Sequence, residues 1–328
     1  MDPFAHSASE RTAAAPAVDI VIVNWNAGAL LRNCVAALDT STTAGRLHVI
    51  VVDNASTDGS AEELVVAAAS LSVIRNAENR GFAAACNQGA ATGRAPLLLF
   101  LNPDVRVAPD TIAQTVDFLA EPAQTATGIV GIRLLDRQGR TSRTCARRPT
   151  VGAMLLRTLF LDRIMPNAVL PHFMTEWDHL DTRPVDQVMG AFLMIRRELF
   201  DRGSGFDQRF FVYYEDLDLC LRMIDHGHAA VHFAGSAAVH DGGGTTSAVK
   251  DRRLFYETTS RVRFMHKWHG MVAASVLALL IALVELPLRA LGTMARAPGD
   301  GGMVVRGAVL FWRNLPRLMR ELSALPPR

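Results

Sequence analysis

The residues with the clearest chemical potential are acids that directly follow a group of aromatic residues. Glu215, Asp216 and Asp218 come after the aromatic segment 210–214 and lead into an apolar, helix-like stretch. Aromatic faces cover the apolar C–H side of a sugar, while a carboxylate takes the proton of a hydroxyl group. The acids could instead only stabilise the N-terminus of the helix, although that explains one or two acids and not their aromatic neighbours. The segment therefore indicates a sugar hydroxyl beside a general base.

A second acid, Asp53, directly follows the hydrophobic run 47–52. A carboxylate held at the end of a strand can accept the imide N–H of uracil or thymine, which no apolar residue could do. The alternative is that Asp53 helps to cap the next helix, as Asp58 is expected to do. Both interpretations of Asp53 stay open from the residues alone.

A third acid stands in Asn102-Pro103-Asp104, directly after the apolar run 97–101. A carboxylate here could hold Mg²⁺ or Mn²⁺ against a diphosphate, because hard cations prefer oxygen ligands. Such a tripeptide in isolation is more often a turn. The tripeptide is better evidence for a metal site when its place along the chain is considered. Asp53, the segment Asn79-Arg80-Gly81 and Asp104 follow one another as a three-part pattern.

These acids must be positioned by the elements around them. Short apolar, β-branched runs predict strands, and the stretches between them predict helices. Their alternation predicts an α/β domain with a mostly parallel sheet, whose ligands bind beyond the carboxyl ends of the strands. The predicted strands are 18–23, 47–52, 72–75, 96–101 and 127–135, and the predicted helices are 30–38, 61–69 and 82–91. Regular patterns return at 188–196 and 205–222, and the chain beyond Lys250 is expected to be helical.

The composition excludes several classes of protein. The chain has 328 residues, of which 49% are hydrophobic and 20% charged, so a disordered or fibrous chain is excluded. No lysine precedes Lys250, which rules out a Walker A loop, and no G-x-G-x-x-G motif follows either of the first two strands. The four cysteines are widely spaced and predict free thiols in a reducing compartment.

Six motifs and a later histidine give the sequence a specific resemblance. With these motifs in the order in which they occur along the sequence, the chain resembles the family 2 glycosyltransferases of the GT-A fold. This is a Rossmann-like fold with a mostly parallel central sheet flanked by helices. More narrowly, it resembles the bacterial rhamnosyltransferases that build cell-surface polysaccharide. The resemblance covers about residues 18–267 and rests on IVIVNWNAG, VIVVDNASTDGS, NRGFAAACNQG, LLLFLNPDV, VMGAFLMIRRELF, GFDQRFFVYYEDLDLCLR and His240.

This resemblance implies an inverting transfer from a nucleotide-diphosphate sugar. The best match is L-rhamnose moving from dTDP-rhamnose to a lipid-linked or saccharide acceptor. Uracil and thymine offer the same imide edge to Asp53, so a UDP-hexose-dependent enzyme of the same fold is an alternative. A non-catalytic nucleotide-binding scaffold subunit is a second alternative.

The resemblance also assigns roles to residues. Asp216 matches the general base, Asp53 the base-binding position and Asp104 the last acid of the metal motif. The other residues expected at the nucleotide sugar are Asn24, Asn26, Arg80 and Asn102, and those expected at the acceptor are Gly190, Tyr214 and Glu215.

One departure from the family pattern concerns the metal. The usual D-x-D motif is Asn102-Pro103-Asp104 here, so a single carboxylate is left to hold Mg²⁺ or Mn²⁺. His240 is a candidate second ligand, and a structural role for it is equally open. The glycine-rich run that begins at Gly242 would suit a loop closing over the diphosphate. Arg222 could face the leaving diphosphate or pair with Glu215 or Asp218, and the pairing is favoured.

The C-terminal region has a different character from the rest. The sequence divides into a flexible leader (1–17), the glycosyltransferase domain (18–248) and a basic, amphipathic helical region (249–328), which carries 13 basic against 5 acidic residues. The uncharged run 271–284 is short of the ~20 residues that span a bilayer.

This region favours attachment to an anionic membrane surface by an interfacial helix. A polyprenyl-diphosphate-linked acceptor would reside in that membrane, so we expect a peripheral protein on the cytoplasmic face of the bacterial inner membrane. The same apolar face could instead form the protein's own core or a homodimer interface, and no nucleic acid partner is expected. The predicted basic face holds Arg306, Arg313, Arg317 and Arg320, and the predicted apolar face holds Val304, Ala308, Phe311, Leu315 and Leu318, with Pro316 expected to kink or restart the helix.

Overall fold

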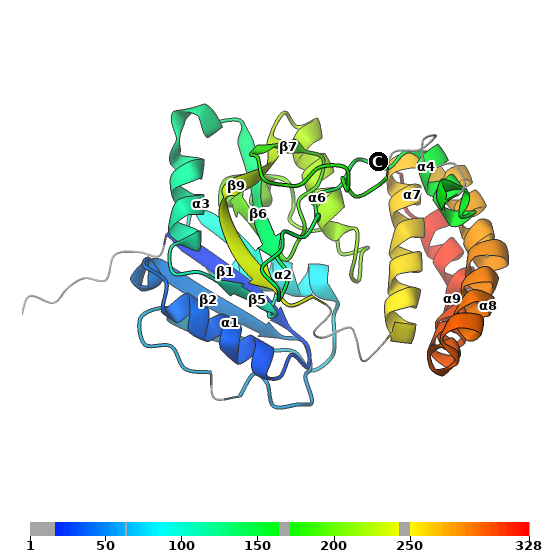
Figure 1. The fold of residues 1–328 in the computed structure, drawn as a ribbon, viewed down its shortest axis with the longest axis horizontal. Helices are drawn as coiled ribbons and strands as arrows, with labels where there is room; N and C mark the ends of the chain where they lie inside the picture. Colours follow the sequence, from blue (N-terminus) through cyan, green and yellow to red (C-terminus); the bar gives the residue numbers. More distant parts are fainter. Residues whose placement is uncertain (1–16, 63, 164–170, 243–249, 328) are drawn as a thin grey trace, which may run out of the picture.

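A computed structural model describes residues 17–62, 64–163, 171–242 and 250–327 of the chain. A central sheet with helices on both faces lies beside a bundle of C-terminal helices (Figure 1). The predicted leader, apart from Ala17, and the glycine-rich run beyond Gly242 lie outside the described residues.

The sheet is mixed, and its strands follow the order β3-β2-β1-β4-β8-β6-β9-β5, with β7 beside β9. Strands β3, β2, β1 and β4 are parallel, whereas β8 is antiparallel to both β4 and β6. Because β8 runs the opposite way, its first residues lie at the same edge as the last residues of β1, β2 and β4. The strands are β1 Val18–Asn24, β2 Leu47–Asp53, β3 Ser70–Arg75, β4 Leu97–Leu101, β5 Val105–Val107, β6 Thr127–Leu135, β7 Arg183–Val185, β8 Phe192–Arg196 and β9 Ala229–His240.

Helices cover both faces of the sheet, and a second group of helices forms the bundle (Figure 1). Helices α1 and α3 pack on one face, and α2 and α6 pack on the other. The bundle consists of α4, α7, α8 and α9. The helices are α1 Ala29–Asp39, α2 Phe82–Thr92, α3 Thr111–Ala120, α4 Val151–Thr158, α5 Arg197–Arg202, α6 Glu215–Asp225, α7 Lys250–Leu280, α8 Leu286–Arg296 and α9 Pro298–Ser323, with a π-helical turn at Ile281–Glu285 between α7 and α8.

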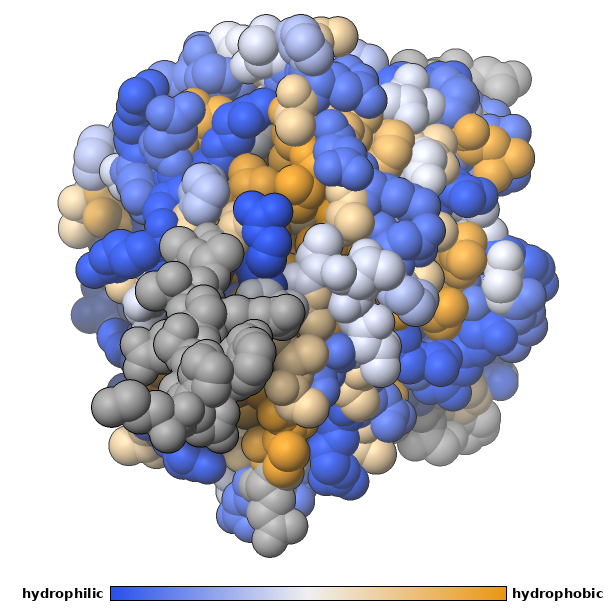
Figure 2. Space-filling view, turned by 90° about the vertical axis from the view of Figure 1, so that its left-hand side faces the viewer, coloured by the Kyte–Doolittle hydropathy of each residue, from blue (hydrophilic) through white to orange (hydrophobic). Residues whose placement is uncertain are grey.

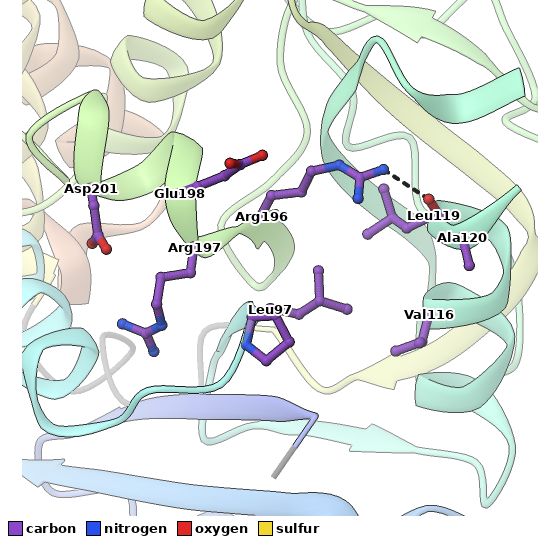
Figure 3. Close-up of a pocket in the computed structure, with 9 residues that line it drawn as sticks. Leu97, Val116, Leu119, Ala120, Arg196, Arg197, Glu198 and Asp201 are labelled. Atoms are coloured by element: carbon purple, nitrogen blue, oxygen red, sulfur yellow. Dashed lines mark hydrogen bonds between the residues drawn. The ribbon is translucent and has the colours of Figure 1, made fainter. Parts of the chain in front are cut away.

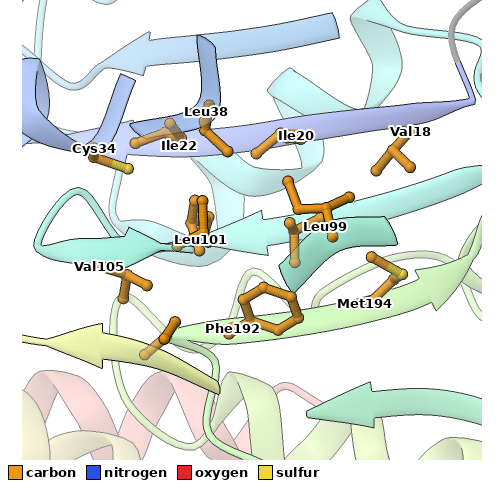
Figure 4. Packing of buried hydrophobic residues seen from close by; sticks show 14 of the residues in the cluster. Val18, Ile20, Ile22, Cys34, Leu38, Leu99, Leu101, Val105, Phe192 and Met194 are labelled. Atoms are coloured by element: carbon orange, nitrogen blue, oxygen red, sulfur yellow. The ribbon is translucent and has the colours of Figure 1, made fainter. Parts of the chain in front are cut away.

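The central strands β1, β2, β4, β6 and β8 are buried on both faces, which explains why they appear in the sequence as continuous apolar runs. Successive side chains point to opposite faces, so Ile20 and Ile22 pack against α1 while Val21 and Val23 pack against α2. Figure 4 shows the first of these layers, where residues of β1, β4 and β8 meet Cys34 and Leu38 of α1. The sheet edge is thereby held rigidly. All four cysteines are buried free thiols, as predicted.

The helix predicted at 61–69 is wrong. The described residues of this stretch, which exclude residue 63, contain turns and no helix. The backbone amides of Ala67, Ala68 and Ala69 all donate to the carboxylate of Asp39, at 2.8, 2.7 and 3.0 Å. Amides committed to a side chain of α1 are not available for helical hydrogen bonds, so the high helix propensity of alanine is overridden.

The bundle contains the main correction to the sequence predictions. The apolar face expected on α9 is turned inward, because Ala308, Phe311 and Leu318 are 2, 1 and 4% exposed and pack against α7 and α8. This is the alternative in which that face forms the protein's own core. Helix α9 is continuous through Pro316.

A sharp bend divides the first long helix of the bundle. Gly270 has φ +83° and ψ 175° inside α7, so residues 250–269 and the apolar residues after 270 form two helical segments. By length and composition alone, the helix from Lys250 to Arg296 could cross a membrane, and 39% of its most apolar window is buried in the protein. The face of the molecule opposite the bundle is mostly hydrophilic where it is visible in Figure 2.

Candidate active site

A cleft of about 800 Å³ opens where the carboxyl edge of the sheet meets the bundle. Asp104, Asp216 and His240 line it together, although 136 residues separate the first from the last in the chain. The edge of a rigid sheet and the start of α6 therefore bring the predicted metal residues and the predicted base to one cavity. Of the site residues predicted from the sequence, those that line this cleft are Asn102, Asp104, Gly190, Tyr214, Glu215, Asp216 and His240.

Asp216 is half-buried at the first turn of α6, and its carboxylate is held from two sides. The amide of Gly190 donates to Oδ2 at 2.9 Å, and the amide of Leu217 donates to Oδ1 at 2.7 Å. The side chain of Gln187 is also hydrogen-bonded to it. Burial raises the pKa of Asp216 despite these hydrogen bonds. A fixed carboxylate with a raised pKa is a more effective base than an exposed one.

The turn before α6 is strained. Tyr213 and Tyr214 both adopt left-handed backbone conformations, with φ 70° and 71°, which non-glycine residues rarely do. Packing compensates for this strain, because Tyr214 lies against Phe264 of α7 with ring centroids 5.3 Å apart. Phe211 stacks on Tyr256 of α7 at 4.6 Å. The predicted aromatic wall is thus shared between the sheet domain and the bundle.

Glu215 is only 5% exposed, and its Oε2 atom has no hydrogen-bond partner among the described residues. Burial raises the pKa of Glu215 well above its usual value, and the negative charge of Asp216 raises it further. Two neighbouring acids in a buried site do not both ionise at neutral pH. Burial and the charge of Asp216 thus favour the protonated form of Glu215, whereas the amides of Gly190 and Leu217 favour the ionised form of Asp216.

Asp104 and His240 form the second group in the cleft. Strands β5 and β9 pair Val105 with His240, which brings Nε2 of His240 to 3.3 Å from Oδ1 of Asp104. A carboxylate oxygen suits both Mg²⁺ and Mn²⁺, whereas an imidazole nitrogen suits Mn²⁺, the softer ion, better than Mg²⁺. No group of three potential metal-ligating side chains occurs among the described residues. These two residues could therefore supply two ligands to a divalent metal ion, whose other ligands would have to come from outside these side chains.

Of the residues predicted to bind the nucleotide, Asn24 and Asp53 are buried at the end of the sheet, and Asn26 and Arg80 are exposed. Asp53 and Asn24 end neighbouring strands in register, and Nδ2 of Asn24 donates to Oδ1 of Asp53 at 2.8 Å. Asn24 is fully buried, so it positions Asp53 and does not reach the cleft, contrary to the sequence prediction. Asp53 lies at the same sheet edge and is 7% exposed; it does not line the cleft, whereas the next residue, Asn54, does.

Asn54 connects the end of β2 to the segment that contains Asn79 and Arg80. Its Nδ2 atom donates to Oδ1 of Asn79 at 2.9 Å, and its Oδ1 atom accepts the amide of Arg80 at 3.0 Å. Arg80 and Asn26 are exposed beside the cleft and do not line it. Asn26 instead accepts the amide of Thr57 at 2.7 Å and so fixes the loop after β2.

Arg222 has the structural role that the sequence favoured. It donates to Asp218 at 2.8 Å and to the carbonyl groups of Gly203 and Gly205. Lys267 of α7 lies 2.7 Å from both Asp207 and Asp218. These ion pairs attach the bundle to the first turns of α6, directly behind Asp216.

Several cleft residues were missed by sequence reasoning. Trp25 and Asn54 belong to motifs that were recognised, and their position after a strand was the available signal. Arg157, Arg253 and Arg289 come from α4, α7 and α8, and nothing in their sequence surroundings marks them as cleft residues. Their position follows only from how the bundle packs.

A second cavity, of about 540 Å³, lies at the opposite end of β4, around Leu97 (Figure 3). The two arginines that line this cavity form hydrogen bonds and ion pairs with other residues of the protein. Arg196 donates to the carbonyl of Leu119 at 2.8 Å, and Arg197 pairs with Asp19 at 2.5 Å. The chemistry predicted from the sequence is therefore concentrated at the carboxyl edge.

Comparison with known proteins agrees with this arrangement. An L-rhamnosyltransferase of Mycobacterium tuberculosis, named for its N-acetylglucosaminyl-diphospho-decaprenol acceptor, is 26% identical over 235 residues, 67% of this chain and 75% of that protein. The Escherichia coli rhamnosyltransferase WbbL is 35% identical over 85 residues, 26% of this chain and 28% of that protein.

The fold is also that of known glycosyltransferases. A mannosyltransferase of Pyrobaculum calidifontis, solved with GDP-Man and Mn²⁺, superposes with a TM-score of 0.50 at 19% identity, covering 90% of this chain and 86% of that one. At this identity the likeness concerns the fold, which is GT-A. The profile of the family described as Glycosyl transferase family 2 matches residues 19–203, more than half of the chain, and the protein is therefore a member of that family.

Proposed function

We propose that this glycosyltransferase transfers a sugar, with inversion, from a nucleotide-diphosphate donor to a lipid-linked acceptor. L-Rhamnose from dTDP-rhamnose is the donor that the rhamnosyltransferase-named relatives favour. The observation that carries the proposal is the convergence of Asp104, His240 and Asp216 on one cleft at the carboxyl edge of the sheet. This position is where open α/β sheets bind their ligands.

Asp216 is the proposed general base. The acceptor hydroxyl attacks the anomeric carbon from the face opposite the diphosphate, the bond from that carbon to the diphosphate oxygen breaks, and Asp216 takes the hydroxyl proton. The hydrogen bonds from Gly190 and Leu217 keep its carboxylate ionised and fixed in direction. Burial and the neighbouring Asp216 raise the pKa of Glu215, so in its protonated form Glu215 would donate a hydrogen bond to the acceptor without competing for the proton.

Asp104 and His240 would hold Mg²⁺ or Mn²⁺. The bound cation would stabilise the negative charge that develops on the leaving nucleoside diphosphate. At the other end of the donor, Asp53 would accept the imide N–H of the nucleobase, with Asn24 orienting its carboxylate at 2.8 Å. Trp25 and Asn54 line the cleft beside it and would contact the nucleoside.

A membrane contact through the bundle is part of the proposal, with different apolar residues from those that the sequence indicated. The outer side of the segment 271–296 exposes a set of apolar side chains, and the outer side of α9 exposes Val305, Val309 and Trp312 beside Arg306 and Arg313. Apolar and cationic side chains on one surface suit an anionic bilayer. The exposed apolar residues of 271–296 include Val272, Val276, Leu279, Leu283, Leu291 and Met294.

This surface supports a peripheral location on the cytoplasmic face of the bacterial inner membrane, where nucleotide sugars and a polyprenyl-linked acceptor would meet. A screen of sugar nucleotides for donor hydrolysis and transfer tests the donor assignment. We expect dTDP-rhamnose to be preferred, with transfer requiring Mg²⁺ or Mn²⁺. A clear preference for a UDP-hexose would remove the rhamnose assignment, and binding of nucleotide without any transfer or hydrolysis would favour a scaffold subunit.

A further inference from the structure

Basic side chains line the part of the cleft that the bundle contributes. They are Arg157 of α4, Lys250 and Arg253 of α7, and Arg289 of α8. Three acids of the cleft, Asp104, Glu215 and Asp216, belong to the sheet domain, and a fourth, Glu257, belongs to α7. The part of the cleft that the helices form therefore has four basic side chains and one acid, and the proposed base lies on the other part.

These basic residues are not equivalent. Arg289 donates to Glu285 at 2.9 Å, and Glu285 also pairs with the buried Arg261 at 2.5 Å, so the charge of Arg289 is compensated inside the bundle. Arg157 and Arg253 are both exposed, and neither forms an ion pair within the part of the chain that the structure describes. The one acid on this side of the cleft, Glu257, lies 3.8 Å from Arg261 and not in an ion pair with either arginine, so both arginines are without an ion-pair partner among the described residues.

Both arginines come from elements that act on or contact the aromatic segment before the proposed base. The positive charge of Arg157 contributes, after burial, to lowering the pKa of His172 to about 4, and it also acts on Tyr214, two residues before Asp216. Arg253 lies on the first turns of α7, whose Tyr256 stacks on Phe211 of the aromatic segment. Helices α4 and α7 are in contact, so the two arginines come from adjacent elements.

A diphosphate is the ligand that this arrangement suits. Guanidinium groups donate paired hydrogen bonds to phosphate oxygens, and a diphosphate can engage two of them. Leu254, Thr293 and Val304 line the same part of the cleft and offer contacts to a hydrocarbon chain. A sugar attached to such a diphosphate would extend from the arginines toward Asp216.

We propose that Arg157 and Arg253 form the subsite for the diphosphate of a lipid-linked acceptor. This inference rests on the proposed function and names the part of the acceptor that the bundle binds. It gives the helices a role in substrate recognition in addition to membrane contact.

The test is the binding of farnesyl diphosphate, measured by calorimetry on the full chain with the donor site already filled by saturating nucleoside diphosphate and Mn²⁺. We expect the double variant Arg157→Gln, Arg253→Gln to lose at least about tenfold in affinity, the loss of one or two charge-assisted hydrogen bonds. Arg252→Gln is the matched control, because Arg252 is an exposed neighbour on α7 that does not line the cleft. Its affinity should match that of the wild type.

Nucleotide affinity, measured separately, shows whether each variant is folded, and the single variants replace the double one if it is not. Unchanged affinity for farnesyl diphosphate in the arginine variants, or no binding by the wild type, would overturn the subsite. An equal loss of nucleotide affinity in a folded variant would also overturn it, since the arginines would then serve the donor. Failure of the wild type to bind any sugar nucleotide would instead refute the proposed function, and that readout is independent of farnesyl diphosphate.

Discussion

The backbone amide of Gly190 donates a hydrogen bond of 2.9 Å to Oδ2 of Asp216. Gly190 stands just before β8, the antiparallel strand in the middle of the sheet, and Asp216 begins α6. This contact fixes the direction of the proposed base from a different element and explains why the sequence motif has a glycine there. A Cβ atom at residue 190 would lie 3.3 Å from Cβ and 3.4 Å from Oδ2 of Asp216.

Gly190→Ala should therefore displace the carboxylate by a few tenths of an ångström. We expect kcat to fall by roughly 10- to 100-fold, because small errors in the position of a catalytic group are costly. The KM for the sugar nucleotide should stay unchanged. Steady-state kinetics with the preferred donor checks this, and a loss confined to the donor KM would contradict the role of Gly190.

Replacement of the base itself should be more severe. Asp216→Asn keeps the shape of the side chain and removes its ability to take a proton, so kcat should fall by about 10²- to 10⁴-fold. Binding of nucleotide and metal, measured by calorimetry, should be retained. Glu215→Gln is the matched control, because glutamine resembles the protonated acid, and its rate should stay within about fivefold of the wild type. Equal losses in both variants would mean that the roles of the two acids are not distinct.

The pH dependence of the reaction should reflect the burial of Asp216. Burial raises the pKa of this group, and only its ionised form can accept the proton. Activity should thus rise with pH through an apparent pKa above the ordinary value of about 3.9 and fall as pH drops below it. In the Glu215→Gln variant, the apparent pKa of this rise in activity at low pH (the acidic limb of the profile) should be the same as in the wild type. A shift of the limb to lower pH would show that Glu215 carries a charge in the wild type.

Lys267 should be needed for stability. It is 6% exposed and lies 2.7 Å from both Asp207 and Asp218, so Lys267→Met removes one of the two cationic partners of each carboxylate and leaves only Arg209 and Arg222 to compensate them. We expect the free energy of unfolding to fall by about 3 kcal/mol. Urea unfolding measures this, with the exposed Arg252→Met as a control that should change it by less than about 0.5 kcal/mol.

The same ion pairs predict the direction of acid sensitivity. Burial alone would raise the pKa of Asp207, but hydrogen bonds from Arg209 and Lys267 outweigh it and hold the pKa below its usual range. A carboxylate with a lowered folded-state pKa stabilises the protein above its unfolded-state pKa of about 3.9, and this stability is lost as pH falls. Lys267→Met should therefore show a weaker loss of stability between pH 5 and pH 3, by roughly the contribution of one paired carboxylate. An identical pH profile would contradict this account of Lys267.

The exposed apolar side of the bundle should bind membranes. Leu279, Leu283 and Leu291 are 56, 71 and 65% exposed, and replacing all three by Gln should lower binding to anionic liposomes by at least about tenfold. Leu180→Gln is the control, since this 57% exposed leucine lies outside the bundle. Substitution is preferable to truncation after Gly270, because truncation would also remove core partners of Phe264 such as Leu277 and Phe311. Unchanged liposome binding by the triple variant would place the membrane contact elsewhere.

The sheet and the acids at its edge could be predicted from the sequence. A buried parallel strand requires a continuous apolar run, and Asp53 and Asp104 each follow such a run directly. The position of Asp216 at the start of α6 was likewise predictable, because acids before an apolar helical stretch mark its N-terminus. What the sequence did not contain was the contact between Gly190 and Asp216, which depends on the antiparallel direction of β8.

Other features depend on tertiary packing and escaped local reasoning. Asn24 was expected to face the nucleotide, but it points into the protein to hold Asp53. An apolar helical face has the same pattern whether it meets lipid or other helices, so the sequence could not show that Phe311 is buried. Arg157 and Arg253 come from elements nearly 100 residues apart, and only the packing of α4 on α7 brings them to one cleft.

A crystal structure of the protein with dTDP and Mn²⁺ tests the central claim most directly, because it locates the leaving group relative to the proposed base. The account predicts that the diphosphate and the ion bind between Asp104 and His240, with the pyrimidine next to Asp53 and the open part of the cleft leading to Asp216. A nucleotide bound away from these residues, or one whose diphosphate points away from Asp216, would contradict it.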